Sequence, residues 1–339
     1  MERIHGAAMQ ILEEIGIDFL HDEAREILQQ AGCDVLADSV TVKMDRALVM
    51  EQVAKAPRRI VMTPRNKDRA LVFGEAYASF GQVSSPPNVS DLDHGRRVGN
   101  RTDYQNWIKL TQSFNCIHFI GGYPVEPVDL HASTRHLDCL FDMLTLTDKL
   151  VHAYSLGVER VEDAMAMVRI AAGLDEAGFA EAPRMFTNIN SSSPLKHDWP
   201  MLDGAMRLAK QNQLVIVTPF TLAGAMAPIT LAGAIAQQTA ECLAAIVLLL
   251  AIVMWIGWRY RGPRGLVPSG VVGALGGALA GATGMGGPPA ILYLMSGDDP
   301  AADVRANMVA YFSIIFVGIV ITFGLLGLVT TEVLWRIAL

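Results

Sequence analysis

The chain has 339 residues, a length that suits two domains of ordinary size. Its formal net charge is −7, and it shows no basic patch of the kind that binds nucleic acid. Its cysteines lie far apart with no C-x-x-C pair, which argues against a structural zinc site and a disulfide scaffold and suits a reducing compartment; they are Cys33, Cys116, Cys139 and Cys242.

The first hundred or so residues predict a helical and β-rich cap. Residues 2–15 place apolar side chains on one face of a charged helix that ends at Gly16, and this segment has no signal-peptide core. A second helix is expected over Asp22–Gln30 and closes at Gly32. A third is expected over 46–55. The segment 58–104 is rich in Pro, Gly and short β-like runs, so we assign 1–115 to the cap.

A regular alternation of strands and helices follows. The expected strands are 116–120, 150–154, 185–189 and 214–218, and the expected helices are 131–146, 159–173, 198–211 and one beginning at Thr230. Four βα units predict a parallel sheet, with which doubly wound and barrel folds both begin. No G-x-G-x-x-G follows any strand, which weakens the dinucleotide-binding reading. We therefore expect 116–245 to form half of a (β/α)8 barrel.

The carboxyl ends of these strands should line an active site in a barrel. The candidate substrate-binding residues there are Tyr123, Tyr154, Asn188, Asn190, Thr218 and Phe220. The alternative for Tyr154, Asn188 and Asn190 is that they only satisfy loop backbone. This rim has no metal cluster and no cysteine–histidine pair.

Other polar residues of the first two units have structural interpretations. Glu126, Asp129 and His131 lie in the first βα loop, where Asp129 is more typical of a cap for helix 131–146 than of a catalytic acid. His118 and His152 are expected in mid-strand, within the core.

Five stretches in order carry a family resemblance over residues 1–245. They are RIHGAAMQILEEIGIDFLHDEAREILQQAGCDV, KAPRRIVMTPRN, PNVSDLDHGRRVG, STRHLDCLFDMLTLTDKLVHAYS and PFTLAGAMAPITLAGAIAQQTAE. This part resembles the trimethylamine methyltransferase family. The resemblance implies a TIM-type barrel that passes a methyl group from a tertiary or quaternary amine to the cobalt of a separate corrinoid (cobalamin) protein, with no cofactor bound directly. Aromatic faces usually hold a quaternary ammonium, and Tyr123, Tyr154 and Phe220 are candidates.

The chain departs from that family after the TLAGA helix. Family members continue into four more βα units, which this sequence lacks. We therefore expect a truncated methyltransferase domain that is inactive as given, because half a barrel leaves part of the substrate pocket missing.

The composition changes near residue 241 from that typical of a soluble protein to that typical of a membrane protein. Every lysine and all eight histidines precede Cys242. The run from Cys242 to 258 is long enough to span a bilayer, with a buried barrel helix as the alternative. Leu266–Met295 is an apolar run broken by glycines and prolines, and Asn307–Val329 is unbroken. We expect 246–339 to be an all-α transmembrane segment, with residues 242–339 contacting lipid.

The broken run, SGVVGALGGALAGATGMGGPPAILYLM, resembles the motif that opens each half of the sulfite exporter (TauE/SafE) family. That resemblance implies export of small sulfur-containing or organic anions. Freed backbone amides at a helix break can face an anion, and the alternative is that the glycines serve packing alone. The candidate transport residues are Gly284, Gly286, Gly287, Pro288 and Pro289.

The two parts conflict in topology. The positive-inside rule places the arginines of loop 259–265 in the cytoplasm, so one preceding span would place residues 1–241 outside. We therefore weigh three hypotheses: a methyltransferase domain, an anion-exporter fragment, and a non-functional chimera of two genes. The expected location is the cell (inner) membrane, with a cytosolic-type soluble domain.

Overall fold

The computed structural model describes residues 1–255 and Tyr311. Met1–Ile256 form one compact unit and Gly257–Leu339 a second, and the account below concerns the first. Its helices are α1 (Glu2–Gln10), a π-helical turn (Ile11–Ile15), α2 (Asp22–Gln30), α3 (Arg46–Ala54), a 3-10 turn (Lys67–Arg69), α4 (Arg101–Ser113), α5 (Arg135–Leu146), α6 (Val158–Ala172), α7 (Glu176–Ala180), α8 (Trp199–Lys210) and α9 (Leu231–Trp255). Its strands are β1 (Ile17–Phe19), β2 (Asp34–Val35), β3 (Thr41–Lys43), β4 (Arg59–Met62), β5 (Leu71–Gly74), β6 (Asn88–Asp91), β7 (Gly95–Val98), β8 (Val151–His152), β9 (Met185–Ile189), β10 (Lys196–His197) and β11 (Leu214–Val217).

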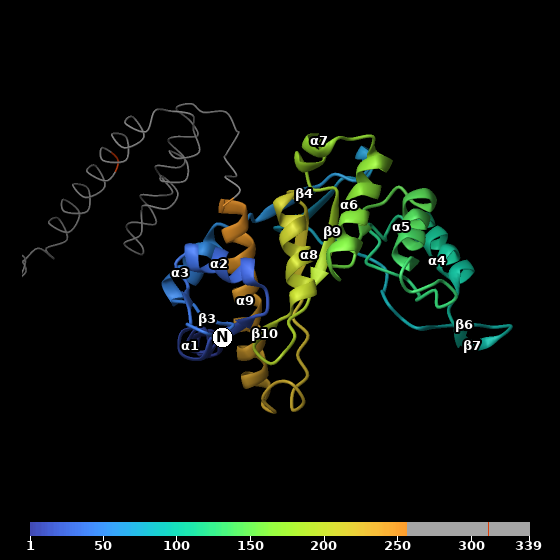
Figure 1. The fold of residues 1–339 in the computed structure, drawn as a ribbon. Coiled ribbons are helices and arrows are strands. Elements are labelled where there is room, and N and C mark those ends of the chain that lie inside the picture. Colours follow the sequence, from blue (N-terminus) through green and yellow to red (C-terminus); the bar gives the residue numbers. More distant parts are fainter. Residues whose placement is uncertain (256–310, 312–339) are drawn as a thin grey trace, which may run out of the picture. The chain divides into compact units, whose positions relative to one another are not determined.

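The predicted parallel sheet is present in the order β11-β9-β8, and both of its strand pairs are parallel. The strand expected over 116–120 does not form as a strand. Only Phe119 pairs there, through isolated parallel bridges to Leu150 and to Gly81. Helices α5, α6 and α8 follow these strands in turn (Figure 1). The described residues close no barrel, so they are compatible with a partial one.

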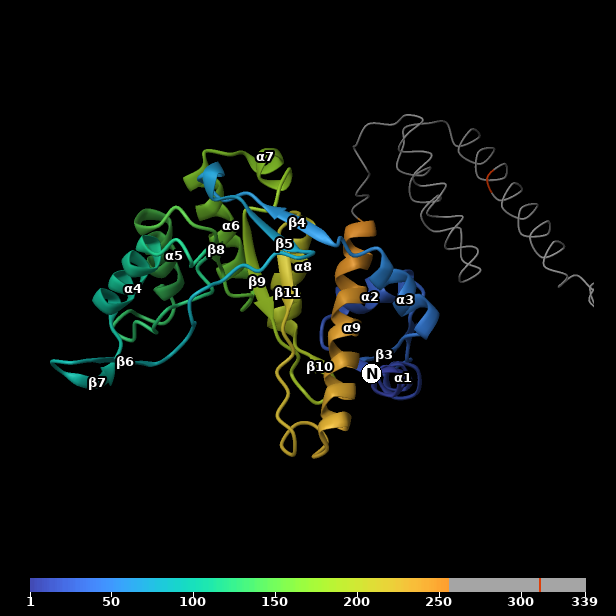
Figure 2. The same cartoon turned by 180° about the vertical axis from the view of Figure 1, so that it is seen from behind.

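Both faces of this sheet are buried, as is usual for a parallel sheet, and successive side chains point to opposite faces. Val151 and Met185 pack among the helices in one core cluster. Phe186 and Leu214 point to the other face, where they meet Ile60 and other residues of the β4–β5 hairpin. Figure 2 shows that hairpin beside β9 and β11. The hairpin therefore covers the side of the sheet that the helices leave free.

A second sheet, in the order β10-β1-β3-β2, joins the N-terminal strands of the first unit to the distant strand β10. Strand β1 pairs antiparallel with β3 and parallel with β10, which lies far along the chain. The turn into β1 depends on Gly16, whose φ is 91° and whose added Cβ would lie 2.9 Å from the Val42 carbonyl oxygen. Two- and three-residue strands leave no periodic pattern, so the sequence did not predict this sheet.

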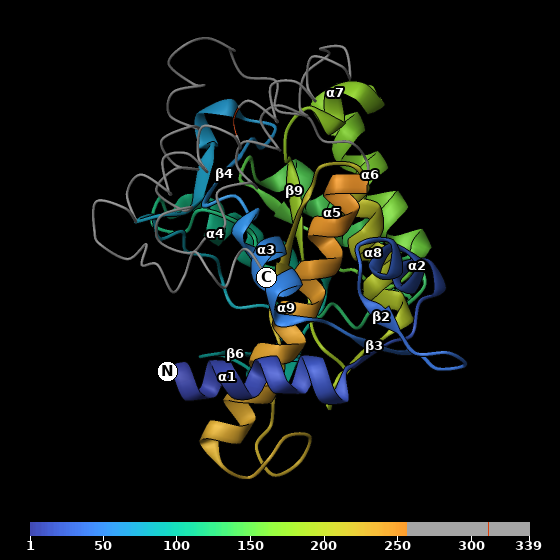
Figure 3. The same cartoon turned by 90° about the vertical axis from the view of Figure 1, so that its left-hand side faces the viewer.

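Helix α9 runs without a break across residues 245 and 246, where the barrel part was expected to end and the transmembrane part to begin. Its buried side chains, which include Val247, Leu248 and Ile252, share a core cluster with Leu12 and Phe19. Figures 1 and 3 show α9 between α8 and the N-terminal helices, with α1 lying across it.

By length and composition alone, α9 is the one helix in the described part that could cross a membrane. More than half of its most apolar window (56%) is nevertheless buried inside the unit. This burial favours the core-helix alternative for the run that starts at Cys242, and a spanning segment there is unconfirmed.

Two details of the first βα unit differ from expectation. The helix expected from 131 begins at Arg135, after an N-cap residue, Thr134, that makes no side-chain cap. Asp129 instead accepts a hydrogen bond from the Arg101 amide at 2.8 Å, at the start of α4, so its assignment as a cap for the following helix was wrong. Helix α4 itself was not predicted.

Of the two histidines expected in mid-strand within the core, only one is buried. His152 is 3% exposed and belongs to the interior, as predicted. His118 is only half-buried, and its Nδ1 accepts a hydrogen bond from the Phe80 amide at 3.0 Å. Its assignment to the core was wrong, because the strand expected there scarcely forms.

The expected membrane features lie outside the described residues. These are the broken run Leu266–Met295, Asn307–Val329 apart from Tyr311, and the candidate transport residues Gly284, Gly286, Gly287, Pro288 and Pro289.

Candidate functional site

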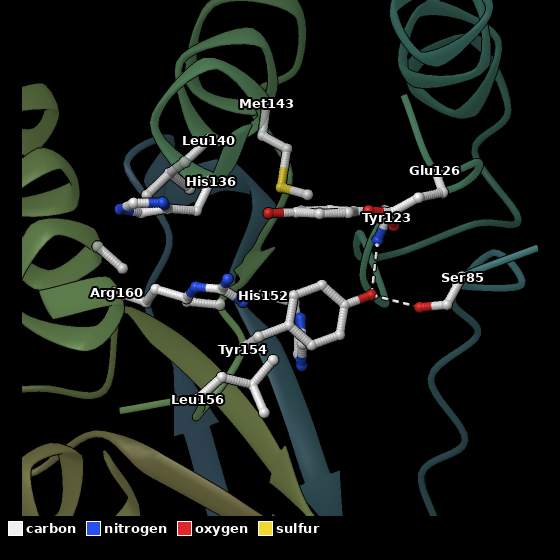
Figure 4. A pocket seen from close by; sticks show the side chains of 12 residues that line it. Ser85, Tyr123, Glu126, His136, Leu140, Met143, His152, Tyr154, Leu156 and Arg160 are labelled. Carbon is white, nitrogen blue, oxygen red and sulfur yellow. Dashed lines mark hydrogen bonds between the residues drawn. The ribbon is translucent and has the colours of Figure 1, made fainter. Parts of the chain in front are cut away.

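A cavity of about 210 Å³ lies where β8 ends and the chain turns toward α6 (Figure 4). Side chains from the two first βα units and from the cap reach it. They are Ser85, Tyr123, Glu126, His136, Leu140, Met143, His152, Ala153, Tyr154, Leu156, Arg160 and Ala164. A space of this size suits a small molecule.

Two predicted residues, Tyr123 and Tyr154, meet at this cavity. Their rings are 4.8 Å apart and almost perpendicular, at 86°. The Tyr154 hydroxyl accepts the Tyr123 amide at 3.1 Å and bonds the Ser85 hydroxyl at 2.6 Å. Burial is the main cause that raises the pKa of both phenols. Two neutral, fixed aromatic rings therefore form one wall.

The position of Tyr154 depends on Gly122. This glycine has a φ of 137°, and a Cβ added there would lie 2.7 Å from the Tyr154 hydroxyl oxygen. Any larger residue would be strained and would push the tyrosine away. The Gly121-Gly122 turn thus permits the close approach that holds the tyrosine pair together.

His152 forms the buried floor of the cavity. Its ring lies 4.8 Å from that of Tyr154 and 5.1 Å from that of Phe186. Neither ring nitrogen has a hydrogen-bond partner in the described part of the chain. Burial lowers the pKa of His152 to about 3, so the imidazole is neutral at physiological pH. Unpartnered buried nitrogens are uncommon and mark a place where a ligand or water can bind.

Charged groups flank the tyrosines on two sides. Glu126 accepts a hydrogen bond from Arg135 at 2.5 Å. His136 of α5 bonds Asp163 through Nε2 at 2.8 Å, and its buried Nδ1 has no partner among the described residues. Figure 4 shows Arg160 and His136 on the side of the cavity opposite Glu126 and Ser85.

The remaining predicted residues lie elsewhere on the sheet. Thr218 donates a hydrogen bond to Asn190 at 2.7 Å, so these two strand-end residues satisfy each other. Asn188 is half-buried, and its Oδ1 lacks a partner in the described part. Phe220 is 54% exposed. None of the four lines the tyrosine cavity, and their role in binding stays a prediction.

Sequence reasoning missed several residues of the cavity, among them Ser85, His136 and Arg160. Ser85 lies in the irregular cap, and the other two lie on helices. Arg160 had a usable signal, because it falls in the first turn of the helix that follows the strand-end residue Tyr154. The other two had none.

Two further features of the described residues bear on ligands. A second cavity, of about 370 Å³, lies between α9, β11 and Pro57, and its lining has no charged or aromatic side chain. No group of three or more His, Cys, Asp and Glu side chains in residues 1–255 is placed to hold a metal ion. The tyrosine cavity is therefore the better place for a charged small molecule.

Comparison with known proteins points to one family. Residues 1–253 match the family described as trimethylamine methyltransferase (MTTB). The chain is 32% identical over 294 residues to a glycine betaine methyltransferase of Desulfitobacterium hafniense strain Y51, covering 87% of this chain and 59% of that protein. It is 26% identical over 249 residues to the trimethylamine methyltransferase MttB of Desulfitobacterium hafniense strain DSM 10664 / DCB-2, covering 72% of this chain and 49% of that protein. The chain thus spans about half the length of the curated relatives it matches.

Proposed function

We propose, from the premise that the chain belongs to the trimethylamine methyltransferase family, that its first unit binds a methylated ammonium compound in the tyrosine cavity. The observation that carries this proposal is the perpendicular pair of Tyr123 and Tyr154 in the cavity wall. A quaternary ammonium spreads its charge over its methyl groups and is attracted to aromatic faces. The two relatives are named for glycine betaine, a quaternary ammonium compound, and for trimethylamine, a tertiary amine.

The reaction that we propose is methyl transfer to a corrinoid protein. When such a partner is bound, its reduced cobalt supplies the electron pair that accepts the methyl group. The bond that breaks is the one from nitrogen to methyl carbon, and the nitrogen keeps its electron pair. A quaternary ammonium therefore leaves as a neutral amine and needs no proton.

The cavity residues suit this proton-free departure. His152 is neutral at physiological pH because burial lowers its pKa to about 3. The hydroxyls of Tyr123 and Tyr154 keep their protons because burial raises their pKa. The side chains can thus hold and orient a cation and exclude water without exchanging protons with it. These features favour a quaternary over a tertiary amine as the methyl donor.

The cavity has a volume of about 210 Å³, which suits the small methyl donor. The proposal therefore leaves the corrinoid on its partner protein, and this chain supplies only the methyl donor. The chain spans about half the length of the two relatives, and the residues proposed to bind the donor lie within the matched part. Transfer depends on positioning to within about an ångström, so the fixed tyrosine pair is proposed to orient the donor for the partner.

Binding can be tested with a cation and its uncharged analogue. Calorimetry with the full chain should detect choline but not 3,3-dimethylbutanol, which has the same shape without the charge. Tyr154→Leu should weaken choline binding by about 5- to 30-fold, because one aromatic face is worth roughly 1–2 kcal/mol. Tyr77→Leu, which changes a tyrosine that is 60% exposed, is the control. Equal affinity for the two compounds would sink the proposal.

A second candidate function concerns the residues beyond 255. We propose that residues 266–329 are a fragment of an anion exporter, on the strength of their apolar runs and of the glycine–proline motif at 284–289. In that case the chain joins two genes and is retained in the cell membrane. Sequencing genomic DNA across codons 240–255 from an independent sample, together with membrane fractionation of the expressed chain, tests this. A soluble full-length chain would contradict it.

A further inference from the structure

The tyrosine cavity is electrically two-sided. Tyr123 and Glu126 lie on one side and Arg160 on the other, with Tyr154 and His152 between them (Figure 4). The first side attracts a cation through an aromatic face, while its carboxylate, Glu126, is ion-paired with Arg135. The second presents a guanidinium, which always carries a positive charge. A simple tetraalkylammonium ion would use one side only and would leave the other without a partner.

The positive side lacks the internal partners that a purely structural arginine would have. No described residue makes a hydrogen bond or ion pair with the half-buried Arg160. On the same helix, Arg169 pairs with Glu176 at 2.9 Å. Beside Arg160, the buried Nδ1 of His136 is also unpartnered in the described unit.

The floor of the cavity also has polar atoms without hydrogen-bond partners. His152 is 3% exposed, and both of its nitrogens lack a partner in residues 1–255. Buried polar atoms nearly always have a partner, so three ring nitrogens around one cavity point to a ligand with polar atoms of its own. Water can satisfy some of them, but an unpaired guanidinium favours an anionic group.

We propose that Arg160 binds the carboxylate of a zwitterionic methyl donor whose quaternary ammonium rests against Tyr123 and Tyr154. This inference deepens the proposed function and depends on it, because it assigns the other end of the same ligand. Arginine matches a carboxylate with two parallel N–H donors, which adds orientation as well as affinity. Arg160 is thus a specificity-determining residue that selects betaine-type compounds over amines without an anionic group.

Calorimetry with the full chain and two probes tests this. Glycine betaine carries the carboxylate, and choline has the same cation with a hydroxyl group in its place. Arg160→Leu should weaken glycine betaine binding by about 10- to 100-fold, as expected for a hydrogen bond to a charged group. It should change choline affinity by less than about 2-fold. Arg160→Lys should recover part of the lost affinity, because lysine restores the positive charge but not the two parallel N–H donors.

The matched control is Arg169→Leu, which removes the same charge from the same helix outside the cavity. Thermal unfolding of each variant shows whether the fold is intact, and Arg160→Lys serves if the leucine variant unfolds. Equal losses for both probes, or no loss for glycine betaine, would overturn the assignment of Arg160 while leaving the proposed function standing. If the unaltered chain binds neither probe, the proposed function and this inference both fail.

Discussion

Glu241 of α9 accepts a hydrogen bond from the Ser191 hydroxyl at 2.5 Å, across 50 positions of the sequence. The same carboxylate, which is fully buried, accepts the Ser193 hydroxyl at 2.6 Å and the Leu195 amide at 2.8 Å. Gln237, one turn earlier, donates to it at 2.9 Å. The loop that follows β9 is therefore held to the core helix by one acidic side chain.

Replacement of Glu241 by alanine should lower the free energy of unfolding by about 2–4 kcal/mol, because three loop donors would lose their shared acceptor. Glu241→Gln keeps one acceptor oxygen and should lower it less. Urea unfolding followed by circular dichroism measures both. Glu162→Ala breaks an exposed ion pair with Arg207 and should change the value by less than about 1 kcal/mol. A similar effect of both alanine variants would contradict this account.

The burial of α9 gives a prediction that separates a core helix from a membrane span. Leu248 is 1% exposed, so Leu248→Ala should destabilise the first unit by about 2–5 kcal/mol. Met254 is 45% exposed, and Met254→Ala should have little effect. Unfolding of the full chain in detergent-free buffer measures both. If the segment instead leaves the unit for a bilayer, the two variants will unfold alike.

His152 makes stability depend on pH in a definite direction. Above the ordinary pKa of 6.5, the ring is neutral in both the folded and the unfolded chain. Between 6.5 and about 3 only the unfolded chain binds the proton, so the free energy of unfolding falls as the pH falls. One such group contributes a slope of up to about 1.4 kcal/mol per pH unit.

His152→Gln should remove that slope, which denaturant midpoints at pH 7.5 and pH 4.5 will show. His197, whose pKa burial also lowers, should maintain a remaining slope in the variant. His94→Gln changes an exposed histidine and is the control. An unchanged slope in His152→Gln would mean that the ring is accessible to protons in the folded chain.

Local signals determined how much of the fold could be predicted. Asp22–Gln30 and Met185–Ile189 were predicted with the bounds that the structure shows. The helix closes at Gly32, and the strand belongs to the regular alternation of strands and helices. The pairing of Asp18 with Lys196 could not be predicted, because strands of two or three residues are set by the distant partner and not by their own pattern.

The candidate site divides in the same way. Tyr123 and Tyr154 follow predicted strands. The general rule that parallel strands end at one rim therefore identified them as candidate site residues. Arg160 and His136 approach the cavity from helices, and Ser85 approaches from the cap. Which helix faces reach the rim depends on how α5 and α6 pack, and that information is tertiary.

The pairing of β1 with β10 has a consequence for synthesis. His21 lies beside Asp203, 182 positions later, and the second sheet is complete only when β10 has been made. At the usual speed of translation the N-terminal helices leave the ribosome roughly 10–40 s before their partners do. During that interval Leu12 and Phe19, both fully buried in the finished unit, lack the cover that Leu248 and Ile252 of α9 provide. We expect this apolar surface of the nascent chain to stay exposed until α9 has been made.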